Sequence, residues 1–163
     1  MGPGVPDATE IPVAMRVRTG PVPASPQANG TQPSAAGDND KLDRLKGTLT
    51  RYTLDFVVAA SGVQLETAAN GTHHGKLEAA LVVYDQDGQA LNWIVRQLDL
   101  DLDAPHYALE QRSGVNFGLT IDVPQSGAYL CGGVYDWTSN LAGTLEFPLR
   151  SVQAGHAPGS GSR

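Results

Sequence analysis

Two aspartates in a turn-like run are the first residues that could bind a metal ion. Asp85-Gln86-Asp87-Gly88 matches the opening of a calcium-binding loop. A complete loop of this kind has a glutamate at its twelfth position, where this chain has Arg96, and an arginine repels a cation. The same run between two alternating segments is typical of a tight hairpin. We therefore interpret Asp85 and Asp87 as turn residues that remain the candidates for a metal site.

Histidines and a row of aspartates are the other potential metal ligands. His73 and His74 are adjacent, so in a strand their side chains would point to opposite faces. The other two histidines lack metal-ligand spacing to them. Asp99, Asp101 and Asp103 alternate along one face, where a linear row converges poorly on one ion and instead protects a sheet edge. We expect no metal and no cofactor.

Catalytic motifs are not found in the sequence. It has no G-x-S-x-G elbow and no G-x-x-x-x-G-K-[ST] phosphate loop. Its one cysteine, Cys131, has apolar neighbours and reads as a small buried residue rather than a reactive thiol. We predict no enzymatic activity. The rival hypothesis is a hydrolase with a site built from Asp85, Asp136 and a histidine.

The two tryptophans are candidate ligand-binding residues. Trp93 follows Asn92 in an alternating segment, and Trp137 lies in the Asp136-Trp137-Thr138 turn. Exposed indoles can form a platform for sugar rings, which makes a carbohydrate-binding module one hypothesis. Core packing or capping of a sheet edge is the alternative for each tryptophan.

Alternation of apolar and polar residues defines the elements that must position these side chains. All ten aromatic residues lie between Tyr52 and Phe147, and most of this window repeats with period two, which indicates strands with one buried face. Pro105 after Asp103, with Gly114 beyond, predicts one crossover helix near 104–112. We predict an all-β, immunoglobulin-like or fibronectin-like sandwich of about seven strands with this helix. The expected strands are 50–60, 62–68, 75–85, 89–102, 115–123, 127–136 and 143–149.

The two ends of the chain differ in composition from this window. Residues 1–37 contain seven Pro, five Gly and no aromatic residue, so we expect a disordered arm there and a second disordered stretch at 150–163. Residues 11–20 alternate like a strand but stand alone before three prolines, and we expect them to be unpaired or disordered. A short helix is predicted at 39–47, which opens a domain at 38–149.

Charge limits the classes of partner. Thirteen acidic and seven basic residues lie between Lys41 and Leu149, and their difference of −6 equals the net charge of the whole chain. An acidic domain of this kind is a poor binder of nucleic acid and of anionic membrane surfaces. The sequence has no run of about 18 apolar residues, so it predicts no membrane-spanning helix. We expect an unidentified protein partner, with carbohydrate as the alternative.

Several short runs between residues 42 and 149 follow the pattern of a known family. They are 70–78, 82–88, 98–102, 121–124, 127–130, 133–136 and 143–149, with Pro105 to Tyr107 at the expected helix. This part of the chain resembles the C-terminal region of VWFA-related acidobacterial domain proteins, a von Willebrand factor type A-related family. The resemblance implies a bacterial accessory β domain with no established catalytic residues.

The resemblance also implies an upstream context. In that family a signal peptide and a type A domain precede the β region, so the resemblance implies an exported protein, periplasmic or extracellular. No signal peptide is visible in this sequence. The type A domain binds a divalent ion through D-x-S-x-S, a motif that does not occur here, so no metal site carries over. The run 15–20 is similar to the last strand of that domain, which would make 1–37 a remnant and linker.

Overall fold

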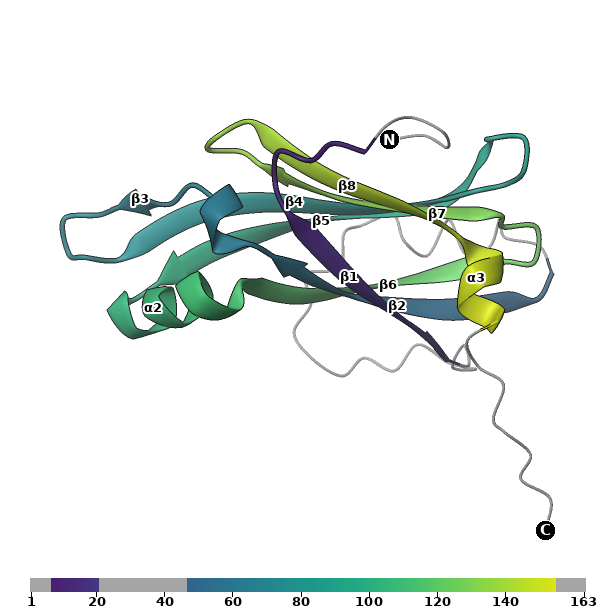
Figure 1. The fold of residues 1–163 in the computed structure, drawn as a ribbon, viewed down its shortest axis with the longest axis horizontal. Coiled ribbons are helices and arrows are strands. Elements are labelled where there is room, and N and C mark those ends of the chain that lie inside the picture. The colour runs from purple at the N-terminus through teal and green to yellow at the C-terminus, as the bar shows by residue number, and fades with distance from the viewer. Residues whose placement is uncertain (1–6, 21–46, 155–163) are drawn as a thin grey trace, which may run out of the picture.

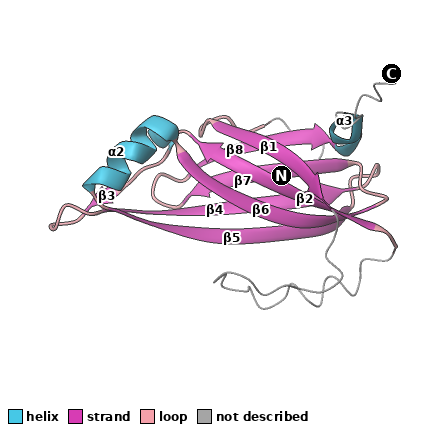
Figure 2. Ribbon diagram, turned by 90° about the horizontal axis from the view of Figure 1, so that it is seen from below, coloured by secondary structure: helices cyan, strands magenta, loops and turns pink. Residues whose placement is uncertain are grey.

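The computed structural model describes residues 7–20 and 47–154, with side chains through residue 151. These residues form two antiparallel β-sheets that face each other, with α2 at one end and α3 at the other (Figures 1 and 2). The elements are β1 (Val13–Gly20), β2 (Leu49–Val58), η1 (Ala60–Gly62), β3 (Glu66–Thr67), β4 (His73–Tyr84), β5 (Ala90–Leu102), α2 (Ala104–Ser113), β6 (Val115–Pro124), β7 (Tyr129–Asp136), β8 (Leu141–Pro148) and α3 (Leu149–Ala154). The predicted all-β sandwich with a short crossover helix is confirmed.

The strand order divides the long strands between a three-stranded and a four-stranded sheet. One sheet has the order β1-β2-β6, and the other has β5-β4-β7-β8, with the short β3 beside the start of β4. In an immunoglobulin constant domain the fourth strand joins the first sheet. Here the fourth long strand, β5, instead pairs with β4 along its length.

The core lies between the two sheets and follows the alternation in the sequence. In β2 every second residue from Tyr52 to Val58 is at most 1% exposed. In β4 the residues at odd positions from Leu77 to Val83 are 0% exposed. Since residues of opposite parity on these strands point outward, each sheet has one face in the core and one outer face.

The segment at 13–20 differs from the sequence prediction. We expected it to be unpaired, but β1 pairs antiparallel with β2 from Val13↔Val58 to Gly20↔Arg51. Ile11 just before it is 1% exposed in the core. The prediction was wrong for these residues because 28 residues separate β1 from its partner strand, beyond the reach of a local pattern. The predicted helix at 39–47 lies, except for Gly47, outside the described residues.

Two smaller differences concern strand lengths and the tail. The predicted strand at 62–68 is only η1 and the two-residue β3. Residues 149–154, mostly assigned to a disordered tail, form α3. The helix at Ala104–Ser113 agrees with the prediction: Asp103 accepts a hydrogen bond from the His106 backbone N–H at 2.9 Å, and Gly114 ends the helix at φ 76°.

Candidate functional site

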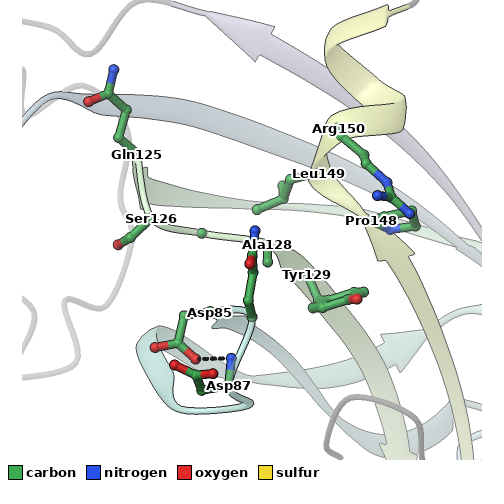
Figure 3. Close-up of a pocket in the computed structure, with 11 residues that line it drawn as sticks. Asp85, Asp87, Gln125, Ser126, Ala128, Tyr129, Pro148, Leu149 and Arg150 are labelled. Carbon is green, nitrogen blue, oxygen red and sulfur yellow. Dashed lines mark hydrogen bonds between the residues drawn. The ribbon is translucent and has the colours of Figure 1, made fainter.

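An open hollow of about 780 Å³ lies at the α3 end of the sandwich. The β4–β5 turn contributes Asp85 and Asp87, the β6–β7 turn contributes Gln125 and Ser126, and the polar lining also includes Tyr129 and Arg150 (Figure 3). The hollow therefore presents both acidic and basic groups from separate elements.

Asp85 is a turn-forming residue in this hollow. Its Oδ1 accepts hydrogen bonds from the backbone N–H groups of Asp87 at 2.9 Å and Gln89 at 2.8 Å, the first of which is drawn in Figure 3. The hairpin loop runs from Asp85 to Gln89, longer than the two-residue turn that Asp87-Gly88 predicts. Among residues 7–20 and 47–154, no group of three or more His, Cys, Asp or Glu side chains is placed to hold a metal ion.

The two tryptophans are exposed but do not share one platform. Trp93 is 45% and Trp137 is 51% exposed. Trp93 lies opposite Val82 on β4, whereas the Trp137 backbone N–H donates to the Lys76 carbonyl at 3.0 Å. Six residues along one strand separate these positions by about 20 Å. One sugar ring cannot touch both indoles.

Trp137 has an aromatic neighbour of its own. The rings of Tyr135 and Trp137 meet edge to face at a centroid distance of 5.4 Å. The Tyr135 hydroxyl donates to Asn140 Oδ1 at 2.7 Å, which fixes the tyrosine ring. A second hollow of about 400 Å³ near this turn is lined by Glu66, His74, Lys76, Asp99, Asp101 and Thr138 among others.

Histidines gather at the α2 end of the sandwich. His73 stacks on Tyr107 of α2 at 3.8 Å and its Nδ1 lies 3.1 Å from the Thr67 hydroxyl. His74 Nδ1 lies 2.5 Å from Asp101 Oδ1. The Thr67 hydroxyl thus lies beside His73, whereas the Asp101 carboxylate lies beside His74. Since adjacent residues of a strand point to opposite faces, the two pairs lie on opposite sides of the sheet. These groups do not form a nucleophile–base–carboxylate relay.

The residues of the rival hydrolase site lie at opposite ends of the β4–β7 ladder. Asp85 follows the Tyr84↔Tyr129 pair, whereas Asp136 lies opposite Leu77. Seven residues along a strand correspond to about 23 Å. The structure therefore does not bring Asp85 and Asp136 together.

Asp136 is a buried anchor. It is 0% exposed, and its carboxylate accepts hydrogen bonds from the Gln64 N–H at 2.8 Å, the Thr138 N–H at 2.9 Å and the Ser139 hydroxyl at 2.8 Å. Three donors to one buried carboxylate satisfy it without a ligand. Its position ties the loop after η1 to the β7–β8 turn.

Cys131 is a buried thiol on β7. It is 3% exposed, and burial together with the nearby Glu146 carboxylate raises the pKa of Cys131 to about 12. A thiol with so high a pKa is protonated at neutral pH and is a poor nucleophile. The interpretation of Cys131 as a small packed residue fits these surroundings.

Ion pairs on the outer face of the β1-β2-β6 sheet were not anticipated from the sequence. Arg51 donates two hydrogen bonds to Asp122, at 2.7 and 2.8 Å, and Arg18 pairs in the same way with Asp55. The Arg18 guanidinium lowers the pKa of Asp55 below its ordinary value. These pairs depend on the strand register, which the sequence does not show: Arg51 and Asp122 are 71 residues apart in the chain but lie opposite each other on β2 and β6.

The exposure of three apolar side chains was also not predicted from the sequence. Val57 on β2, Val95 on β5 and Leu109 on α2 are 38%, 46% and 56% exposed. Val95 follows Trp93 at a spacing of two, so both point to the outer face of the same sheet.

The fold and these surfaces define an antiparallel β-sandwich with open hollows at its ends. Comparison with family models, with curated proteins and with solved structures gives no match to this chain. Within the part of the chain that the structure describes, no helix is long and apolar enough to cross a membrane.

Proposed function

We propose that this chain is a non-catalytic interaction module that binds a protein partner through the outer face of the β5-β4-β7-β8 sheet. The observation that best supports this is an apolar band across that face. The register places Trp93 and Val95 of β5 beside Val82 and Ala80 of β4.

The band has the composition of a small protein interface. Two large side chains, each nearly half exposed, stand beside the partly buried Val82 and Ala80 of β4. The next row is polar, with Gln97 opposite Glu78 and Asp99 opposite Lys76. An apolar centre with a polar rim is the usual anatomy of protein–protein contacts.

The separation of the reactive groups supports a non-catalytic role. The His74–Asp101 pair is exposed, at 47% and 71% for the two side chains, and so is the His106–Asp103 pair at the start of α2. Catalytic acids and bases usually lie in a cleft that excludes water. These pairs instead stabilise strand and helix ends.

We also propose that the module is the C-terminal accessory domain of an exported, VWFA-related bacterial protein. The support is the set of short runs between residues 42 and 149 that resemble that family. Sequencing the gene upstream of Met1 tests this: a type A domain with D-x-S-x-S is expected there, and an in-frame stop just before Met1 would count against it.

The interaction proposal is tested with two matched surface variants. Val95→Asp places a charge in the apolar band, and Leu109→Asp places one on α2 at a similarly exposed apolar site. We expect Val95→Asp, but not Leu109→Asp, to lose partners that the wild type captures from extracts of its own organism. Circular dichroism checks that both variants fold. Equal capture by both variants would contradict the proposal.

A carbohydrate-binding module is the second candidate, supported by the exposure of Trp93 and Trp137. The Tyr135–Trp137 pair, with carboxylates in the neighbouring hollow, offers both an indole face and acceptors for sugar hydroxyls. Because the tryptophans are about 20 Å apart, each is a separate contact. Iodide quenching of Trp93→Phe and Trp137→Phe variants, with and without a glycan panel, tests each indole alone. Protection by a glycan would favour this candidate.

A further inference from the structure

Residues 8–20 join the two sheets of the sandwich (Figure 1). The first part bonds to β8: the Ile11 N–H donates to the Ala142 carbonyl at 3.0 Å, and the Thr144 N–H donates to the Ala8 carbonyl at 2.8 Å. The second part is β1, which pairs with β2. This segment, which we call the closing segment, thus fills a groove between the edges of β2 and β8.

The groove is shaped for the side chains of the closing segment. A Cβ at Gly143 of β8 would overlap the Ile11 backbone oxygen and lie 2.8 Å from Val13 Cγ2. A Cβ at Gly132 of β7 would lie 2.7 Å from Met15 Sδ. Such distances are shorter than van der Waals contact, so glycine leaves the room that Ile11, Val13 and Met15 occupy. The groove accepts an extended segment with large apolar residues at alternate positions.

The covalent connection to this segment is far longer than its geometry needs. Gly20 lies directly opposite Arg51, so a hairpin loop of two to five residues would join β1 to β2. The chain instead has residues 21–48 between them, 28 residues. Fully extended, a connection of this length reaches about 90 Å. It is long enough for the closing segment to enter the groove of another copy.

We propose that the closing segment is exchangeable, and that the groove between β2 and β8 also takes residues 8–20 of a second copy of this chain. In the exchanged dimer each copy gives its segment and receives the other, which closes a two-fold assembly. Every contact of the groove is reproduced between chains. The balance between the two forms is then set by concentration, because a linked segment competes at an effective concentration in the millimolar range.

A disulfide between chains tests the exchange directly. Arg18 and Thr53 are Cα partners in the β1–β2 ladder, a separation that suits a disulfide, and both side chains lie on the outer face. One full-length chain carries Arg18→Cys and another carries Thr53→Cys, both with Cys131→Ala. The matched control replaces Thr53→Cys by Thr120→Cys, which lies one strand further from β1.

The two chains are unfolded, mixed and refolded together, then oxidised and separated by mass. We expect an Arg18–Thr53 cross-linked dimer after refolding at about 1 mM chain, at least tenfold less at about 10 µM, and none with the Thr120 control. A single chain with both cysteines reports whether β1 pairs with its own β2. If that chain forms its disulfide while the mixture gives only monomers at both concentrations, the exchange proposal is refuted. Failure of the single-chain disulfide would refute the β1–β2 pairing on which the proposal rests.

Discussion

Replacing Phe56 by alanine is the sharpest test of the core. Phe56 is 1% exposed in the middle of β2, between Met15 on β1 and Phe117 on β6. Its ring stacks on that of Phe117 at a centroid distance of 4.9 Å and an interplanar angle of 11°. The side chain therefore lies in the core at the middle strand of the β1-β2-β6 sheet, and removing it leaves a cavity in the centre of the sandwich.

The expected loss is about 3–5 kcal/mol of unfolding free energy, the usual cost of deleting a buried phenylalanine. About 0.5–1.5 kcal/mol of this belongs to the aromatic pair beyond its buried area. Since a domain of this size has a total stability of about 5–15 kcal/mol, the variant loses a large fraction of its stability. The midpoint of thermal unfolding should fall by about 10–25 °C.

Urea unfolding followed by far-ultraviolet circular dichroism measures this change. Val57→Ala is the matched control, because Val57 is the next residue of β2, points outward and is 38% exposed. We expect that control to cost less than about 0.5 kcal/mol. A double-mutant cycle of Phe56→Leu with Phe117→Leu isolates the ring pair. A loss below about 1 kcal/mol for Phe56→Ala, equal to that of Val57→Ala, would refute the inward position of this ring.

Three other predictions concern buried groups and the domain boundary. Asp136→Ala should lower stability by about 3 kcal/mol, because buried donors lose their acceptor, whereas Asp136→Asn should cost less; equal costs in a urea titration would contradict this. The pKa of Cys131 is raised to about 12, so the unfolded chain releases this proton first as the pH rises, and the thiol destabilises the fold between about pH 9 and 12. The melting temperature of the wild type should therefore fall relative to Cys131→Ala between pH 8 and 10.5, and parallel curves would count against it. Limited trypsin digestion should spare Arg16 and Arg18 of β1 together with residues 49–148, because β1 pairs with β2 along its length, and early cutting within 75–136 would contradict that domain.

The strands of the core could be read from the sequence because burial imposes period two. This holds for β2 and β4, where one face is fully buried. The same period-two pattern predicted a strand at 62–68, but only η1 and the two-residue β3 form there. There the edge of β4 from Leu77 onward is occupied by β7, which leaves residues 73–76, and of these His73 and His74 pair with β3. A strand needs a free edge as well as a pattern, and the pattern does not report which edges are free.

The candidate site could be predicted in its residue types but not in its distances. Trp93 and Trp137 were predicted as candidate ligand-binding residues, and both are substantially exposed. Their separation depends on the register of β4 with β5 and on the turn after β7, which no local motif encodes. The same reason explains why Val95, the apolar neighbour of Trp93, was not predicted: its role depends on Ala80, which lies opposite it on β4.

The charges of the two outer faces lead to a last prediction about the partner. The β1-β2-β6 face carries Arg16 and further arginines, whereas the rim of the apolar band carries Glu78 and Asp99, with Lys76 between them. A partner that covers the band should therefore present basic groups at its edge, because complementary rim charges accelerate association. Glu78→Gln with Asp99→Asn should lower the association rate several-fold, change dissociation little, and reduce the dependence of the rate on salt. Arg16→Gln on the opposite face is the control and should leave the rate unchanged. Surface plasmon resonance at several salt concentrations would measure both; an association rate equally affected by Arg16→Gln would mean that the partner contacts the other sheet.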